Sequence, residues 1–301
     1  MRKICLAPLA GVTNITAREF FTDLGAELTH TEMISCEGLI RNNPKTFDML
    51  KISDYEAPLI IQLFAPDENV LLNGAENLLK IVNHKNFYGL GVNMACPMPK
   101  VTKNSCGAAL LKKPDTAFKM IKNISSFKIP VWVKIRKLEN KIDTFKFIEL
   151  LLNAGADNVC IHGRTQPQRY EGKSDKQIVF DSAKEFPGKI SASGDVWTLN
   201  DINEYFSNNC EYVMLARGAI ANPWLFSEYH GIQKTKPQKL NDILKLAERT
   251  KNLLNEHKGL VALKKFSLSL LKGFEGGAEL RNKICMSQNY SDAINILMQN
   301  I

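Results

Sequence analysis

The sequence predicts an α/β protein, a (β/α)8 TIM barrel followed by an all-helical C-terminal region. Short, nearly continuous apolar runs recur eight times before His230, and longer stretches with helical spacing separate most of them. Strands of this kind belong to a parallel sheet that is covered on both faces. Eight strand–helix units in about 230 residues also match the usual barrel length of about 250 residues.

The predicted strands are rich in β-branched and apolar residues. They start at Lys3, Glu27, Pro58, Tyr88, Pro130, Asn158, Lys189 and Tyr212. An Asp, Asn or Pro stands near the start of several predicted helices, where it suits the first turn. These helices start at or near Asp67, Pro114, Asp143 and Leu199. A doubly wound open sheet is the rival fold, but no G-x-G-x-x-G follows the first strand.

Beyond His230 the pattern changes to helices without strands. The polar, proline-containing residues 234–239 predict a linker, and apolar spacing predicts helices over 240–257 and 260–274 and one or two more over 278–300. We therefore expect a catalytic barrel domain over residues 1–230 and a helical domain over 237–301.

Composition excludes several classes of protein. Hydrophobic residues make up 45% and charged residues 23%, which is typical of a globular chain and not of a disordered one. The seven cysteines include no CxxC pair, so we expect a reduced compartment and no metal site. The apolar start contains Pro8 without a signal-peptide cleavage pattern, and no run reaches the roughly 18 residues of a membrane helix. We expect a cytoplasmic monomer that makes no membrane contact.

The chain is basic, with 39 Lys+Arg against 31 Asp+Glu. This balance favours a polyanionic partner, although many basic proteins bind none. From Glu228 to Ile301 there are 12 Lys+Arg against 7 Asp+Glu, so this segment carries +5 of the net charge of +8 and the rest carries +3. Such runs are often only solvated faces, so the charge alone leaves the partner open.

Polar or reactive side chains stand at seven of the eight predicted strand ends, where this barrel fold places its active site. Lys134 emerges from an apolar strand and needs an anion beside it, such as a reduced flavin, unless it only extends to solvent. Gln62 lies in a similar strand, and its amide suits a flavin pyrimidine edge. The loops 193–195 and 216–218 offer small residues and one guanidinium, which suit a phosphate.

A set of motifs in the barrel resembles the tRNA-dihydrouridine synthases. The motifs are APLAGVTN, IQLF, NMACP followed by GAALL, VKIR, HGRTQPQRYEG, SGDV and ARGAIANPW, and they span Ala7 to Trp224. In the tail, ALKKFSLSLLKGFEGGAELR is similar to the family's helical domain. The sequence departs from the usual family motifs at two positions. Ala95 stands where Gly is commoner, and Ser193 stands where relatives often carry Asn.

The resemblance implies an FMN enzyme that reduces selected uridines of tRNA to 5,6-dihydrouridine, with NADPH re-reducing the flavin. Hydride from flavin N5 would add at uracil C6. Cys96 would donate the proton to C5, because a thiol of pKa near 8.5 is mostly protonated at neutral pH. Cys106 stands where relatives commonly have a small residue, and we interpret it as incidental. The FMN contacts implied by the motifs are Pro8, Leu9, Ala10, Glu32, Gln62, Lys134, His162, Ser193, Gly194, Asp195, Ala216 and Arg217.

The resemblance also implies contacts with tRNA. Chemistry on a base in folded RNA requires that base to be splayed out of its stack. Asn93 would lie beside the base, and the residues at the entrance would be Arg164, Thr165, Gln168 and Tyr170. The phosphate contacts in the tail would be Lys264, Lys265, Lys272 and Arg281.

Two other functions are weighed against this one. A flavin reductase of the dihydroorotate or enoate type would share the barrel and the FMN site, but the basic tail argues against it. A non-catalytic RNA-binding protein would need neither Cys96 nor Lys134. The motifs encode neither the modified uridine nor the preference between NADPH and NADH.

Overall fold

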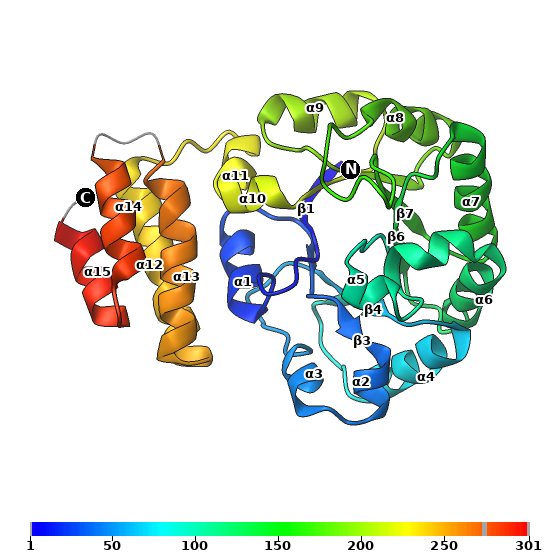
Figure 1. The fold of residues 1–301 in the computed structure, drawn as a ribbon, viewed down its shortest axis with the longest axis horizontal. Helices are drawn as coiled ribbons and strands as arrows, with labels where there is room; N and C mark the ends of the chain where they lie inside the picture. Colours follow the sequence, from blue (N-terminus) through cyan, green and yellow to red (C-terminus); the bar gives the residue numbers. More distant parts are fainter. Residues whose placement is uncertain (1, 273–275, 300–301) are drawn as a thin grey trace.

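A computed structural model describes residues 2–272 and 276–299, and in these residues nine parallel strands form one sheet (Figure 1). The hydrogen-bonded order is β1-β9-β8-β7-β6-β5-β4-β2, with β3 also paired to β4. The strands are β1 (Lys3–Leu6), β2 (Thr29–His30), β3 (Ile34–Ser35), β4 (Leu59–Phe64), β5 (Phe87–Met94), β6 (Val131–Arg136), β7 (Asn158–His162), β8 (Ile190–Ser193) and β9 (Tyr212–Leu215).

Backbone contacts between β1 and β2 close this sheet into a barrel. The Leu6 N–H donates to the Leu28 carbonyl, and Cys5 forms a parallel bridge with Leu28. The predicted second strand is interrupted after β2, because the Thr31 hydroxyl accepts the Gln62 N–H that a continuing strand would have paired. The predicted fold class, a (β/α)8 barrel, is confirmed.

Helices surround the sheet, as Figure 1 shows. They are α1 (Ile15–Asp23), α2 (Cys36–Ile40), α3 (Pro44–Asp48), α4 (Glu68–Leu79), α5 (Pro99–Thr102), the 3-10 helix η1 (Gly107–Lys112), α6 (Pro114–Ser125), α7 (Lys141–Asn153), α8 (Lys176–Glu185), α9 (Leu199–Ser207), α10 (Arg217–Ala221) and α11 (Leu225–Tyr229). Asp67 caps α4 by accepting the N–H groups of Asn69 and Val70. Helix α7 starts two residues before the predicted Asp143, because Asn140 caps it and accepts the Asp143 N–H.

A small layer of buried side chains fills the inside of the barrel. Its members are Cys5, Ala7, Leu28, Ile60, Trp132, Cys160 and Met214. A barrel of eight strands is just wide enough for side chains to fill it. Open space for a ligand is therefore left at the carboxyl ends of the strands.

The tail is a bundle of helices beyond α1 and α11 (Figure 1). The helices are α12 (Lys236–Leu253), α13 (Glu256–Leu270), α14 (Gly277–Met286) and α15 (Tyr290–Gln299). The predicted linker over 234–239 is wrong, because Thr235 caps α12 and Pro237 fits its first turn. Residues 273–275 of the tail motif lie outside the described residues. No helix within the described ranges is long and apolar enough to cross a bilayer.

Aromatic and hydroxyl contacts join the bundle to α1. The Phe266 ring of α13 lies 5.4 Å from Phe20 and 6.0 Å from Phe21, measured between ring centroids. The hydroxyls of Thr16 and Thr250 are 2.9 Å apart and hydrogen-bonded. Helix α1 therefore fixes the position of the bundle beside the mouth of the barrel.

Helix α1 is itself held by a buried ion pair. The Arg18 Nε donates to Glu56 Oε2 over 2.6 Å, and both side chains are almost fully buried. The same guanidinium donates to the carbonyls of Thr13 and Lys51. Breaking a buried pair of this kind leaves an uncompensated charge.

We predict that Arg18→Ala lowers the free energy of unfolding by about 3–5 kcal/mol, because Glu56 is left buried without its partner. Urea unfolding measures the change. The control is Lys51→Ala, which removes the exposed pair with Asp48 and should change stability by less than about 1 kcal/mol. Equal effects of the two substitutions would contradict the role given to Arg18.

Candidate active site

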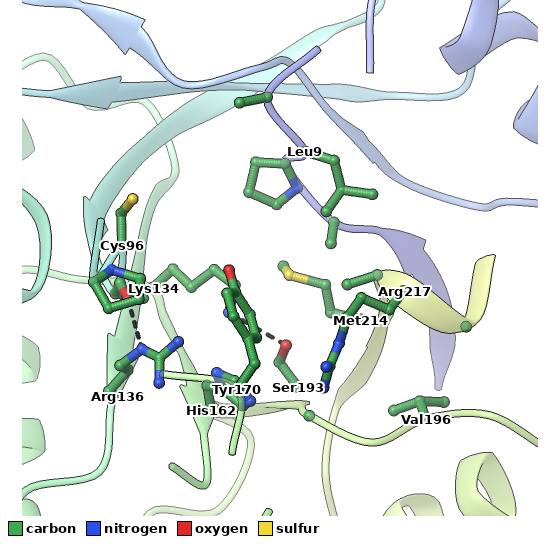
Figure 2. Close-up of a pocket in the computed structure, with 18 of the residues that line it drawn as sticks. Leu9, Cys96, Lys134, Arg136, His162, Tyr170, Ser193, Val196, Met214 and Arg217 are labelled. Atoms are coloured by element: carbon green, nitrogen blue, oxygen red, sulfur yellow. Dashed lines mark hydrogen bonds between the residues drawn. The ribbon is translucent and has the colours of Figure 1, made fainter. Parts of the chain in front are cut away.

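A cavity of about 350 Å³ opens at the carboxyl ends of the strands (Figure 2). Its size falls within the range of small-molecule sites. All predicted FMN contacts line it except Glu32 and Gln62, and so do the predicted substrate residues Asn93 and Tyr170. The functional residues on its wall are Pro8, Leu9, Ala10, Asn93, Cys96, Lys134, Arg136, His162, Tyr170, Ser193, Gly194, Asp195, Ala216 and Arg217.

Lys134 presents a cation to the cavity from β6. Its Nζ donates to Ser193 Oγ over 3.2 Å, as Figure 2 shows, and no acidic side chain of the described residues pairs with it. Burial lowers the pKa of Lys134, and the nearby Arg136 adds to this effect. An anion bound in the cavity would stabilise this charge.

His162 lies beside this cation at the end of β7. Burial and then the neighbouring cations, Lys134 first, lower the pKa of His162 to about 2. The imidazole is therefore neutral at physiological pH. It acts as a hydrogen-bonding group and not as a charged one.

Asp195 joins two arginines at the rim. Arg164 donates to both its carboxylate oxygens, over 2.9 and 2.7 Å, and Arg217 donates over 3.1 Å. Burial opposes ionisation of Asp195, but the bonds from Arg164 and the Ser174 N–H outweigh it and hold the Asp195 pKa below its ordinary value. Arg164 is thus buried and engaged, whereas 40% of the Arg217 side chain is exposed.

The loops after β8 and β9 approach each other closely. Gly194 has a φ of +112°, and a Cβ there would overlap the side chains of Ser174 and His162. A Cβ on Gly218 would overlap the Val196 carbonyl oxygen. Only glycine fits at these two positions, so a compact wall of backbone lies beside Arg217, as a phosphate site requires.

Asn93 holds the loop that carries Cys96. Its Oδ1 accepts the Cys96 N–H over 2.9 Å and the Ala95 N–H over 3.2 Å. Its Nδ2 donates to Gln62 Oε1 over 2.8 Å. Gln62 therefore lies behind Asn93, away from the wall of the cavity, and its amide oxygen supports the loop.

The segment after Cys96 packs back onto it. The Ala108 N–H donates to the Cys96 carbonyl over 3.0 Å. Gly107 has a φ of +60°, and a Cβ there would lie only 2.7 Å from the Cys96 carbonyl oxygen. Cys106 is buried off the cavity wall, and burial raises its pKa to about 11. All seven cysteines are free thiols.

Cys96 is the partly exposed thiol on the wall of the cavity. Burial raises its pKa above that of an ordinary thiol, while a backbone hydrogen bond at Met98 and the charges of Arg136 and Lys134 oppose this rise. The thiol is therefore protonated at neutral pH and can donate a proton to a bound molecule.

Arg136 stands at a predicted strand end, but the sequence analysis assigns it no role in the site. Its Nε donates to the Ala95 carbonyl over 2.8 Å (Figure 2), and its Nη1 donates to the carbonyls of Thr165 and Arg169 over 2.9 and 2.7 Å. The Tyr170 ring lies 5.5 Å from this guanidinium and 5.0 Å from that of Arg217. The available signal was strand periodicity, because residues two apart in a strand share a face, and Lys134 is two residues before Arg136.

Among the predicted site residues that lie off the cavity wall are Thr165, a predicted tRNA contact, and Glu32, a predicted FMN contact. Thr165 is buried and its N–H donates to Gln168, so it does not line the cavity. Glu32 accepts the Gly11 N–H and lines a separate cavity of about 220 Å³ between barrel and bundle, together with Lys265.

Three of the predicted phosphate contacts in the tail, Lys264, Lys265 and Arg281, make internal hydrogen bonds. Lys264 donates to the carbonyls of Cys285 and Ser287 at the end of α14. Arg281 donates to the Leu271 carbonyl. Lys265 lies 3.5 Å from the Gly11 carbonyl, and Lys272 is exposed.

Comparison with known proteins agrees with the resemblance in the motifs. A sequence model of the family described as dihydrouridine synthase (Dus) matches residues 5–300. A probable tRNA-dihydrouridine synthase of Aquifex aeolicus is 27% identical over 300 residues, which cover 97% of this chain and 94% of that protein. Another from Treponema pallidum is 27% identical over 309 residues, which cover 96% of this chain and 90% of that protein.

A solved structure, that of the Amycolatopsis orientalis BexX/CysO complex, has a TM-score of 0.50 and 10% identity, and covers 76% of this chain and 87% of that chain. At this identity the likeness concerns the fold alone. The match over residues 5–300 is far more extensive, and it joins the barrel, the bundle and the Cys96 loop in one family pattern. The chain therefore belongs to the dihydrouridine synthase family of enzymes.

Proposed function

We propose that this enzyme reduces uridines in tRNA to 5,6-dihydrouridine with bound FMN, and that NADPH or NADH supplies the electrons in the cytoplasm. In this proposal the barrel, residues 1–230, binds FMN and the tail, residues 237–301, helps to bind tRNA. The family match and the names of the relatives support the reaction. The observation that carries the proposal is that Cys96 and Lys134 face one cavity.

The cavity fits FMN in three respects. Lys134 is a half-buried cation without an acidic partner among the described residues, and it suits the negative charge of a reduced flavin ring. Arg217 and the close-packed loops after β8 and β9 suit a phosphate. Pro8 and Leu9 add apolar contact to the lining of the cavity, and Leu9 lies above Lys134 and Arg217 in the view of Figure 2. When bound, FMN supplies the hydride that reduces C6 of uracil.

The chain itself supplies the proton. Addition of hydride at C6 leaves negative charge on C5 and the C4 carbonyl, and a proton at C5 completes the saturated bond. The Cys96 thiol holds that proton, because its pKa is raised by burial. Asn93 Oδ1 accepts the Cys96 N–H over 2.9 Å. This hydrogen bond holds the Cys96 backbone, so the thiol stays on the cavity wall when the base enters.

We predict that Lys134→Met raises the stability of the FMN-free protein but weakens FMN binding by at least about 10-fold. The substitution removes a half-buried charge that has no anionic partner among the described residues, while FMN loses a charge contact. Urea unfolding and titration of FMN fluorescence measure the two effects. Lys137→Met is the control, because Lys137 pairs with Asp175 and does not line the cavity. Equal loss of FMN affinity in both variants would contradict the proposed contact.

We predict that Cys96→Ala retains FMN and tRNA binding but forms dihydrouridine about 100-fold to 10,000-fold more slowly, as expected for loss of a general acid. The matched control is Cys106→Ala, which removes a buried thiol off the cavity wall and should retain activity. Single-turnover assays with an unmodified tRNA transcript measure the rates. Normal turnover by Cys96→Ala would show that another group donates the proton.

The pH dependence follows from the same thiol. As an acid, Cys96 must be protonated, and burial raises its pKa above that of an ordinary thiol. The rate with saturating tRNA should therefore stay level through neutral pH and fall only at alkaline pH. His162, with a pKa of about 2, should add no further change between about pH 5 and 9. A rate that rises with pH through this range would indicate a thiolate mechanism instead.

A further inference from the structure

A second groove, of about 340 Å³, adjoins the active-site cavity. Pro97 lines both spaces, and it directly follows Cys96. One wall of the groove contains Pro97, Thr102 and Lys112, and the other contains Gln166, Arg169 and Glu171. The groove therefore lies next to the residue that follows the thiol, between the segment after Cys96 and the loop after β7.

The Cys96 side of the groove is strongly positive. Residues 97–113 contain four lysines and no acidic residue. These lysines, Lys100, Lys103, Lys112 and Lys113, are exposed, and none forms an ion pair with a described residue. On the other wall Arg169 is exposed, and Glu171 is the one acid among the lining residues.

Arg136 fixes the two walls relative to each other. Its guanidinium donates to the Ala95 carbonyl on one side and to the carbonyls of Thr165 and Arg169 on the other. A buried guanidinium with three such bonds is a firm link. The groove is thus preformed, and its exposed side chains need no rearrangement of the backbone to reach a ligand.

The cations of the tail are less available. Lys264 and Arg281 donate to internal carbonyls, and Arg249 pairs with Glu19 and Asp23. Free positive charge next to the cavity is therefore found at the groove. Of the four phosphate contacts predicted in the tail, Lys272 alone is exposed without a hydrogen bond to an internal carbonyl among the described residues.

We propose that this groove binds the sugar–phosphate backbone of the RNA strand next to the target uridine, with Lys112 and Arg169 contacting phosphates. The proposal rests on the proposed function, since a base that enters the cavity brings its neighbouring phosphates to the rim. Charge on both walls suits a polyanion. The positive charge continues beyond the lining of the groove at Lys100, Lys103 and Lys113. A polynucleotide is long enough to contact these further cations, whereas a dinucleotide such as NADPH is not.

The test compares two double charge reversals in the full-length FMN-loaded protein. Lys112→Glu/Arg169→Glu changes the groove, and Lys122→Glu/Lys146→Glu places the same charge on exposed positions of the outer helices α6 and α7. We expect the groove variant to bind an unmodified tRNA transcript at least about 10-fold more weakly at 0.1 M salt. We also expect its slope of log Kd against log salt to fall by about 1.5, the value for two lost phosphate contacts.

The control variant should stay within about 2-fold of the wild type, because only the general charge has changed. Thermal unfolding checks that each variant is folded, and Lys100→Glu/Lys112→Glu replaces the groove variant if Arg169→Glu prevents folding. Equal weakening in groove and control variants overturns the proposal. Unchanged tRNA affinity with a raised KM for NADPH also overturns it and assigns the groove to the reductant.

Failure of the proposed function gives a different result. In that case the wild-type enzyme itself forms no dihydrouridine in the transcript, whatever the groove variants bind. Dihydrouridine is measured in the same samples by mass spectrometry of the digested RNA. A wild type that forms it, with a groove variant that binds normally, contradicts the groove proposal alone.

Discussion

The candidate active site depends most on the three hydrogen bonds of Arg136. Its buried guanidinium holds the Ala95 carbonyl in one loop and the carbonyls of Thr165 and Arg169 in another. Hydrogen bonds to a charged group contribute about 1.5–3 kcal/mol each, and a lysine has no planar fork with which to make this set. The position of Cys96, the Tyr170 ring over the cavity and the shape of the adjoining groove all follow from this link.

Whether a charged side chain of this site can contact a ligand depends on whether another residue already neutralises it. Asp195 neutralises Arg164 and part of Arg217, so the rim keeps one exposed guanidinium. Lys134 is left without a carboxylate in the described part of the chain, so the interior of the cavity attracts an anion. The tail carries a net charge of +5, but this number alone does not show which cations can bind RNA. An ammonium group that donates to the carbonyls at a helix end is not free to contact a phosphate, so the hydrogen bonds of each cation are the better guide.

Much of this site was predictable, because parallel strands bring their carboxyl ends to one edge. Apolar runs locate the strands, and polar residues after them locate Cys96, Lys134 and His162. Contacts between distant side chains were not predictable in this way. The bond from Asn93 to Gln62 and that from the Gln62 N–H to Thr31 depend on how loops meet in space, and no local pattern encodes this. The prediction of a linker over 234–239 was wrong for a local reason. Proline is as well suited to the first turn of a helix as it is to a linker.

The protonation state of Cys96 tests the account most directly, since a general acid must carry its proton at neutral pH. Cys285 is the exposed cysteine of the chain and Cys96 is partly exposed, whereas the other five are buried. In a Cys285→Ser background, the rate of alkylation by iodoacetamide therefore reports the Cys96 thiolate. The account predicts a midpoint above that of an ordinary cysteine, because burial raises the pKa of Cys96. A midpoint below about pH 7, as found for activated thiolates, would contradict it.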